Sequence, residues 1–303
     1  MQNGSFARKV KRKLAASSRR VLQKFTLCRT RNKDVVSKAM QCHVYETMEK
    51  KYRSILEAGV TPGEQQRSNK VWICWLQGFE SAPDLVKACY QSVKQNLRGY
   101  EIIALDSANI GDYVQLPDYI EEKRERGALP MAQYSDLIRL AVLCKYGGLW
   151  IDATVLCTSA DIMKVIDREP LFVFKSLQLS PRDKAPTVAS NWCIAACSNH
   201  PILLLTQKLL YEYWRNERGL KDYFIFHIFF ALAARKYAEE WNRMPLFNNI
   251  SPHVLQFELG SEFSEERWSQ ILSFSSLHKL NRRMDYSDRP NSFYAHILRQ
   301  YLN

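Results

Sequence analysis

Three charged side chains at fixed spacing are the part of this sequence best suited to chemistry. Asp136 and Arg139 lie three residues apart in an apolar segment, and Asp152 follows the apolar run at 149–151. A helix places residues three apart on one face, and a carboxylate at the end of a buried strand can hold a hard cation or a polar ligand. Taken singly, Asp152 is better explained as a turn or cap residue after a strand, and Asp136 and Arg139 could form a surface ion pair. The combined spacing of Asp136, Arg139 and Asp152 favours a functional site.

The elements that position these side chains can be read from the same segment. Apolar periodicity predicts a helix over 135–146, and the Gly-Gly pair at 147–148 ends it. The apolar residues that follow predict a strand over 149–156, with Asp152 where the strand emerges. Helix, glycine pair and strand therefore bring the three charges together.

The segment 135–154, SDLIRLAVLCKYGGLWIDAT, resembles the donor-sugar signature of retaining glycosyltransferases, which reads SD-x-x-R, then Gly-Gly, then D-x-D. Clostridial glucosylating toxins and yeast-type initiating mannosyltransferases carry that signature. The chain most closely resembles the bacterial capsular polysaccharide synthesis glycosyltransferases, whose strand often ends in D-A-T, as residues 152–154 do here. The resemblance extends from about Val71 to the C-terminus. It implies a GT-A-type nucleotide-sugar-binding fold.

The resemblance also implies an activity. A hexose would move from a nucleotide sugar to a saccharide or lipid-linked saccharide acceptor in capsular or exopolysaccharide synthesis, with retention at the anomeric carbon. Donor-binding roles fall on five residues: Trp75, Asp136, Arg139, Gly148 and Lys279. Trp75 would stack on the base, the carboxylate and guanidinium at 136 and 139 would bind sugar hydroxyls or phosphate, and Lys279 would pair with phosphate.

A divalent metal, Mn²⁺ or Mg²⁺, is the expected cofactor, because the departing diphosphate needs its growing charge neutralised. Asp152 is the expected catalytic residue and metal ligand, and His278 would complete the metal shell. Thr154 stands where many relatives carry a second Asp, which removes one charge from the site. Asp222 is a second candidate catalytic residue that would orient an acceptor hydroxyl, although a helix N-cap explains it as well.

The basic charge of the chain is concentrated at its start. Residues 1–33 hold eleven of the 43 Lys and Arg residues and no acid, while the other 32 face 31 Asp and Glu. Apolar residues recur at helical spacing in this tail, at 10, 14, 21, 22 and 25. The pattern indicates a basic amphipathic helix in peripheral contact with an anionic membrane, or a solvated arm. Nucleic acid is not an expected partner, because no binding module follows and the remaining chain is nearly neutral.

Strands and helices alternate from about Val71 onward. The predicted strands are 71–76, 101–105, 149–156, 171–175 and 192–196, and the predicted helices are 84–97, 135–146, 201–214 and 223–237. Such alternation predicts an α/β fold of Rossmann-like type, with a mixed, mostly parallel sheet and flanking helices. The expected organisation is a basic tail at 1–33, a helical N-terminal segment and linker at 34–69, and the GT-A domain at 70–303.

No apolar run approaches the ~20 residues that span a bilayer, and no apolar core follows the basic N-terminus. The expected location is therefore the cytoplasm, with peripheral contact at the inner face of the cell membrane. Two alternatives stay open. A non-catalytic nucleotide-sugar or saccharide-binding protein on the same fold is compatible with Thr154. A haloacid-dehalogenase-type phosphatase would explain residues 151–155, IDATV, but not the missing second Asp or the residues at 136 and 139.

Overall fold

The computed structural model describes residues 32–176, 185–284 and 286–302. Its contacts divide the chain into two units, Met1–Met48 and Glu49–Asn303. The amphipathic helix predicted in the basic tail lies outside the described residues. Within the described residues, no helix is long and apolar enough to cross a bilayer.

Helix α2 (Lys33–Lys51) contains the described part of the first unit and runs into the second. It is followed by α3 (Arg53–Ala58), so this segment contains two helices. Residues 59–69 contain neither helix nor strand and lead into the first strand of the sheet. The domain boundaries at 33/34 and 69/70 stay predictions.

The second unit is built on a five-stranded sheet with the order β2-β1-β3-β6-β5. Its strands are β1 (Lys70–Cys74), β2 (Glu101–Leu105), β3 (Gly148–Ile151), β5 (Leu171–Lys175) and β6 (Ala189–Ala196). Strand β1 runs parallel to β2 and β3, whereas β6 is antiparallel to both of its neighbours. All strands except β6 therefore share one direction, which confirms the predicted mixed, mostly parallel α/β sheet.

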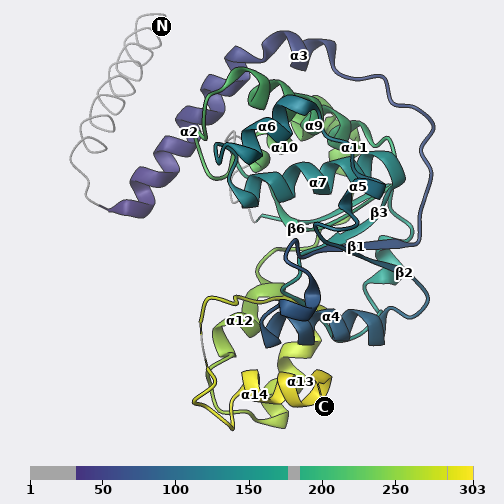
Figure 1. Ribbon diagram of the computed structural model, residues 1–303, viewed down its shortest axis with the longest axis vertical. Coiled ribbons are helices and arrows are strands. Elements are labelled where there is room, and N and C mark those ends of the chain that lie inside the picture. The colour runs from purple at the N-terminus through teal and green to yellow at the C-terminus, as the bar shows by residue number, and fades with distance from the viewer. Residues whose placement is uncertain (1–31, 177–184, 285, 303) are drawn as a thin grey trace, which may run out of the picture. The chain divides into compact units, whose positions relative to one another are not determined.

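Helices cover both faces of this sheet (Figure 1). Alternating strand residues point to opposite faces: Val71 and Ile73 pack in the cluster that includes Val86 and Val93 of α4 (Asp84–Asn96). The other face carries α7 (Met131–Tyr146), α9 (Pro201–Asn216) and α10 (Ile225–Lys236). The predicted flanking helices are therefore present, and both faces of the sheet are buried.

One predicted element is wrong. The strand expected over 149–156 is broken, because the chain turns at 152–154, where the Val155 amide donates to the Asp152 carbonyl over 3.0 Å. After this turn β4 (Val155–Cys157) leaves the sheet and pairs antiparallel with β7 (Leu277–Lys279). The turn sets Asp152 at the edge of the sheet instead of within a strand.

The C-terminal helices pack on the α4 side of the sheet (Figure 1). Leu85 and Cys89 of α4 share a buried cluster with Trp268, Phe293 and Ile297. The helices concerned are α12 (Val254–Glu258), α13 (Glu265–Phe274) and α14 (Phe293–Leu302). The shorter remaining elements are η1 (Phe79–Ser81), α5 (Ile110–Tyr113), α6 (Asp118–Glu125), α8 (Met163–Ile166), α11 (Ala238–Arg243) and η2 (Ser251–His253).

The join between α7 and β3 needs glycine at both positions. Gly147 and Gly148 have φ angles of +67° and +98°, a region that side chains disfavour. A Cβ atom on Gly148 would lie 2.3 Å from the Lys70 carbonyl oxygen of the neighbouring strand. The glycine pair therefore fixes how closely α7 and β3 approach β1.

We expect Gly148→Ala to lower the free energy of unfolding by roughly 3 kcal/mol or more, because it combines a strained φ with a clash against backbone. Chemical denaturation followed by circular dichroism measures this change. Gly99→Ala is the matched control: a Cβ there meets nothing within 4 Å, so its stability should stay within about 0.5 kcal/mol of the wild type. Equal stability of the two variants would contradict this account of the join.

Candidate functional site

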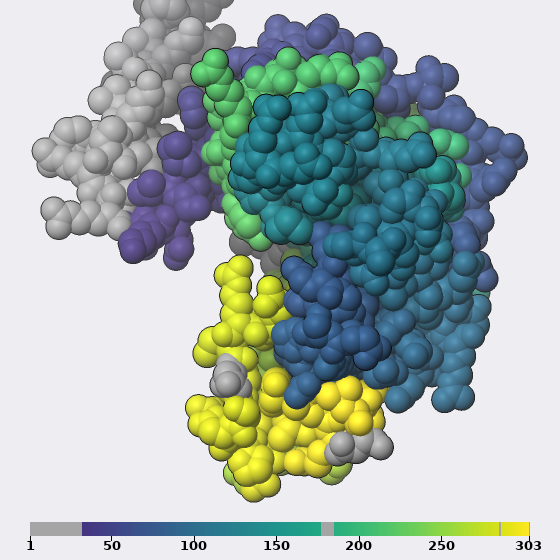
Figure 2. All heavy atoms as spheres, viewed as in Figure 1, coloured from purple at the N-terminus to yellow at the C-terminus, as the bar shows by residue number. Residues whose placement is uncertain are grey.

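A cleft opens at the edge of the sheet where β1 and β3 end. Its volume is about 750 Å³, within the range of ligand-binding clefts. The notch between the yellow C-terminal segment and the teal and green helices above it is visible in Figure 2. Its lining includes Trp75, Gln133, Asp136, Arg139, Asp152, Thr154, Asn191, Tyr223, His227, Lys279, Arg282 and Arg283. Segments far apart in sequence therefore meet at one edge.

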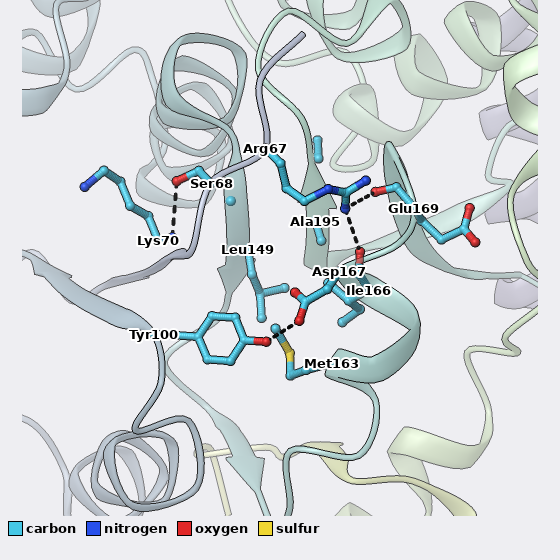
Figure 3. A pocket seen from close by; sticks show the side chains of 12 residues that line it. Arg67, Ser68, Lys70, Tyr100, Leu149, Met163, Ile166, Asp167, Glu169 and Ala195 are labelled. Carbon is cyan, nitrogen blue, oxygen red and sulfur yellow. Dashed lines mark hydrogen bonds between the residues drawn. The ribbon is translucent and has the colours of Figure 1, made fainter.

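A second, much smaller cavity of about 20 Å³ lies at the opposite, amino-terminal end of β3 (Figure 3). Tyr100 bonds to Asp167 on one side of it, and Arg67 donates to the backbone oxygens of Ile166 and Glu169. That volume has room for about one water molecule. This cavity is therefore too small for a substrate.

Arg139 joins two carboxylates at the floor of the cleft. Its Nη1 pairs with Asp136 Oδ1 and its Nη2 donates to Asp152 Oδ1 over 3.0 Å. The guanidinium carbon lies 4.8 Å from the Trp150 ring centroid and 5.7 Å from that of Phe226, distances suited to cation–π attraction. Arg139 is 3% exposed. It therefore fixes the middle of α7 to the end of β3.

Asp136 is buried beside this arginine. Its Oδ1 also accepts a hydrogen bond from Asn191 Nδ2 over 2.8 Å. Burial raises the pKa of Asp136 to about 6, against the lowering effect of Arg139 and Asn191. The protein therefore stabilises the ionised form of this carboxyl only weakly, and a ligand hydroxyl that donates to it would stabilise that form.

The pKa of Asp152 is shifted in the opposite direction from that of Asp136. Its Oδ1 accepts from Arg139 and from Trp150 Nε1 at 3.2 Å, and its Oδ2 lies 3.5 Å from Lys279 Nζ. Burial raises the pKa of Asp152, but the nearby Lys279 and Arg139 charges outweigh it and hold the pKa below its usual value. Asp152 is therefore ionised at neutral pH.

The far wall of the cleft comes from the C-terminal segment. Lys279, the last residue of β7, donates to the Thr154 hydroxyl, and the Leu280 amide donates to the Thr154 carbonyl over 2.9 Å. Trp75 is half-buried just after β1, and the Arg282 guanidinium carbon lies 5.1 Å from its ring centroid. The structure thus brings together five of the predicted site residues: Trp75, Asp136, Arg139, Asp152 and Lys279.

His278 is not among them. It is fully buried, and its Nε2 lies 3.4 Å from Thr158 Oγ1. Because alternate strand residues point to opposite faces, the strand that directs Lys279 into the cleft directs His278 away from it. Burial lowers the pKa of His278 to about 4. The structure therefore does not place it beside Asp152 as a metal ligand.

Gly148 and Asp222 also lie away from the cleft lining. Gly148 begins β3, at the end remote from Asp152, and packs against Lys70. Asp222 Oδ1 accepts from the Phe224 amide over 2.7 Å in the turn before α10. The N-cap of α10 is Phe224, so Asp222 is not the helix N-cap that sequence left open. Its neighbours Tyr223 and Phe224 line the cleft.

Gln133, Arg282 and Arg283 are among the lining residues that were not predicted. Gln133 lies one turn before Asp136 on α7 and is 2% exposed. Its Nε2 donates to the Tyr223 carbonyl over 3.1 Å, and its Oε1 finds no hydrogen-bond partner among the described residues. Helical spacing from Asp136 was the available signal for Gln133. Arg282 and Arg283 follow Lys279 closely in sequence, but only the fold shows that they face the cleft.

The expected divalent metal would have to bind at Asp152. No group of three or more His, Cys, Asp and Glu residues that could hold a metal occurs within the described ranges. A cation bound to Asp152 Oδ2 at about 2.1 Å would lie at most about 5.6 Å from Lys279 Nζ, which is 3.5 Å from that oxygen. At an effective dielectric of about 20, the two like charges would repel by at least about 6 kcal/mol. These residues fit a divalent metal poorly, and its requirement stays a prediction.

Comparison with known proteins places the chain in a family. The model of the family described as capsular polysaccharide synthesis protein matches residues 25–297. The chain belongs to this family. The family predicted from segment 135–154 is thus confirmed.

The chain was also compared with solved structures and with curated proteins. The chain is similar to a solved structure described as "PaToxG Glycosyltransferase", with a TM-score of 0.39 and 15% identity over 88% of this chain and 97% of that chain. No curated protein matches the sequence.

We expect Arg139→Met to lower the free energy of unfolding by about 3–5 kcal/mol, because it leaves the buried Asp136 and the half-buried Asp152 without their shared cation. Urea denaturation measures the loss. Arg126→Met is the control, since Arg126 is 77% exposed where it pairs with Glu122, and it should cost no more than about 1 kcal/mol. Similar small losses in both variants would show that Arg139 does not hold the site together.

Proposed function

We propose that this protein is a glycosyltransferase that moves a hexose from a nucleotide sugar to a saccharide or lipid-linked saccharide acceptor in capsular polysaccharide synthesis. The observation that carries the proposal is the Arg139 bridge between Asp136 and Asp152, with the Lys279 ammonium 3.5 Å from Asp152. Membership of the capsular polysaccharide synthesis protein family supports it.

The cleft suggests how a donor would lie. The base would stack on Trp75, as sequence predicted, displacing or covering the Arg282 guanidinium. The hexose would place hydroxyl groups against Asp136 and Asn191, which already share a hydrogen bond. The diphosphate would then lie near Lys279, between the base and the sugar.

The acceptor would approach past the start of α10. Tyr223 and Met131 line this side of the cleft and are 59% and 50% exposed, so they offer apolar contact area beside the sugar site. Asp222 would act here as a positioning residue, because its bond to the Phe224 amide shapes the turn that carries Tyr223.

In the proposed reaction, the bond between the anomeric carbon and the diphosphate oxygen breaks, and its electron pair stays with the diphosphate. The acceptor oxygen bonds to the same carbon, and its proton passes to the departing phosphate. Asp136 and Asp152, the carboxylates of the described cleft lining, are both paired with Arg139. Because both carboxylates are paired, the departing phosphate is favoured as the acceptor of the proton. This is the proton transfer expected for a reaction with retention. The protein's part is to position substrates and stabilise charge.

The phosphatase alternative receives no support from the site. A haloacid-dehalogenase-type enzyme needs a second Asp where this chain has Thr154, whose hydroxyl is bonded to Lys279. The other alternative is a non-catalytic binding protein, and the following experiment distinguishes it from a glycosyltransferase.

We expect purified protein to hydrolyse one donor from a panel of UDP- and GDP-sugars, assayed by nucleotide release with and without Mn²⁺. Asp152→Asn should lower kcat/KM by about 100-fold or more, because it weakens the carboxylate that holds Arg139 and Lys279 in place. Asp161→Asn, at a carboxylate 72% exposed, should leave the rate unchanged. Donor binding without any release would favour the non-catalytic alternative, and absence of both would refute the proposal.

Donor affinity should depend on pH through Asp136. Because burial raises its pKa to about 6, the carboxyl gains a proton below that pH and loses its capacity to accept two hydroxyl hydrogen bonds. We expect donor affinity to fall as pH drops below about 6, by up to about tenfold per pH unit, in calorimetric titrations. Asp136→Asn should bind weakly with a flat profile, and Asp161→Asn should keep the wild-type profile. A flat wild-type profile from pH 5 to 8 would contradict this role.

A further inference from the structure

We propose that the side chains of Lys279, Arg282 and Arg283, here called the basic cluster, neutralise the donor diphosphate in place of a divalent metal. This inference rests on the proposed function and deepens it. All three residues line the cleft and lie on one short segment that begins at the end of β7.

The first observation is the position of the Lys279 ammonium. It bonds to the Thr154 hydroxyl and lies 3.5 Å from Asp152 Oδ2. In a D-x-D arrangement these two sequence positions both carry carboxylates, and a cation lies beside them. Here Thr154 makes the second position neutral, and the Lys279 ammonium lies beside the two residues. One unit of fixed positive charge therefore already faces the expected diphosphate.

The second observation is that one oxygen of each carboxylate is already committed. Asp152 Oδ1 accepts from Arg139 and Trp150, and Asp136 Oδ1 accepts from Arg139 and Asn191. Divalent cations such as Mg²⁺ need hard oxygen ligands close to ideal geometry. The described lining offers no other carboxylate. A metal would therefore be left with Asp136 Oδ2 and with Asp152 Oδ2, which Lys279 already approaches to 3.5 Å.

The third observation is the charge left over in the cleft. Arg139 is shared between the two carboxylates, so the remaining positive charge comes from the basic cluster. Neither Arg282 nor Arg283 has an ion-pair partner among the described residues. Guanidinium groups match phosphate oxygens as a donor fork, and Arg282 lies over Trp75, where the base would stack. Base and diphosphate sites are therefore adjacent, as a nucleoside diphosphate requires.

During transfer, the electron pair released from the glycosidic bond would collect on the diphosphate oxygen beside Lys279. The ammonium has three donors on a flexible stem. It can therefore exchange its bond to the Thr154 hydroxyl for a bond to phosphate while staying near Asp152. The basic cluster supplies in this way the charge stabilisation expected of a metal.

The test is calorimetric titration of the full chain with UDP, GDP and inorganic pyrophosphate, in EDTA and in Mn²⁺. We expect at least one of these ligands to bind in EDTA, with less than about threefold change on adding Mn²⁺. In EDTA, Lys279→Gln should weaken binding about tenfold or more, and Arg282→Gln with Arg283→Gln should also weaken it. Lys164→Gln, at a lysine 77% exposed, should not. Binding only with Mn²⁺, or unchanged binding by Lys279→Gln, would overturn the inference.

A double variant keeps the inference testable if Lys279→Gln alone fails to fold. Lys279→Gln combined with Thr154→Asp removes the ammonium and adds the missing carboxylate, so this double variant should bind Mn²⁺ in electron paramagnetic resonance titrations where the wild type does not. Tight one-to-one Mn²⁺ binding by the wild type would overturn the inference. Donor hydrolysis that occurs only with Mn²⁺ would overturn it while leaving the proposed function standing. Absence of nucleotide binding and hydrolysis under both conditions would refute both.

Discussion

The site depends on one buried cation held between two carboxylates. Arg139 pairs with Asp136 on its own helix and with Asp152 at the end of β3. Burying a guanidinium is costly unless its charge and hydrogen bonds are met, and here Trp150 and Phe226 pack against it as well. Because the partners come from different elements, this pairing couples the packing of α7 to the geometry of the strand end.

The rest of the second unit can be understood as support for that contact. The glycine pair lets the chain pass from α7 into β3 against the Lys70 carbonyl, so the helix and the strand lie close enough for Arg139 to reach Asp152. The turn at 152–154 then takes the chain out of the sheet, and β4 pairs with β7. That pairing carries Lys279 from the C-terminal part of the chain to the same carboxylate.

Local spacing accounts for what could be predicted from sequence. Strands β2 and β5 have the expected bounds, because each is a short run bounded by turn residues. Asp136, Arg139 and Asp152 meet as expected, because their distances along the chain are set by one helix, one turn and one strand. Trp75 lies at the end of the neighbouring parallel strand, and so at the same edge.

What could not be predicted depends on pairing between distant segments. The register of β4 against β7 decides that Lys279 faces the cleft and His278 does not, and a one-residue shift would reverse them. The short run 277–279 gave no separate strand signal. No local sequence pattern indicates the pairing of β4 with β7. This pairing takes the chain out of the sheet after β3 and brings Arg282 and Arg283 to the cleft.

The central claim is that a nucleotide sugar lies across this cleft with its hexose held by the buried charges. The most direct measurement is a crystal structure of the protein with a nucleotide sugar for which hydrolysis or binding is detected. The account predicts the base on Trp75, the hexose hydroxyls within hydrogen-bond distance of Asp136, and the diphosphate in contact with Lys279. A nucleotide sugar bound outside the cleft, or one whose hexose points away from Asp136, would contradict it.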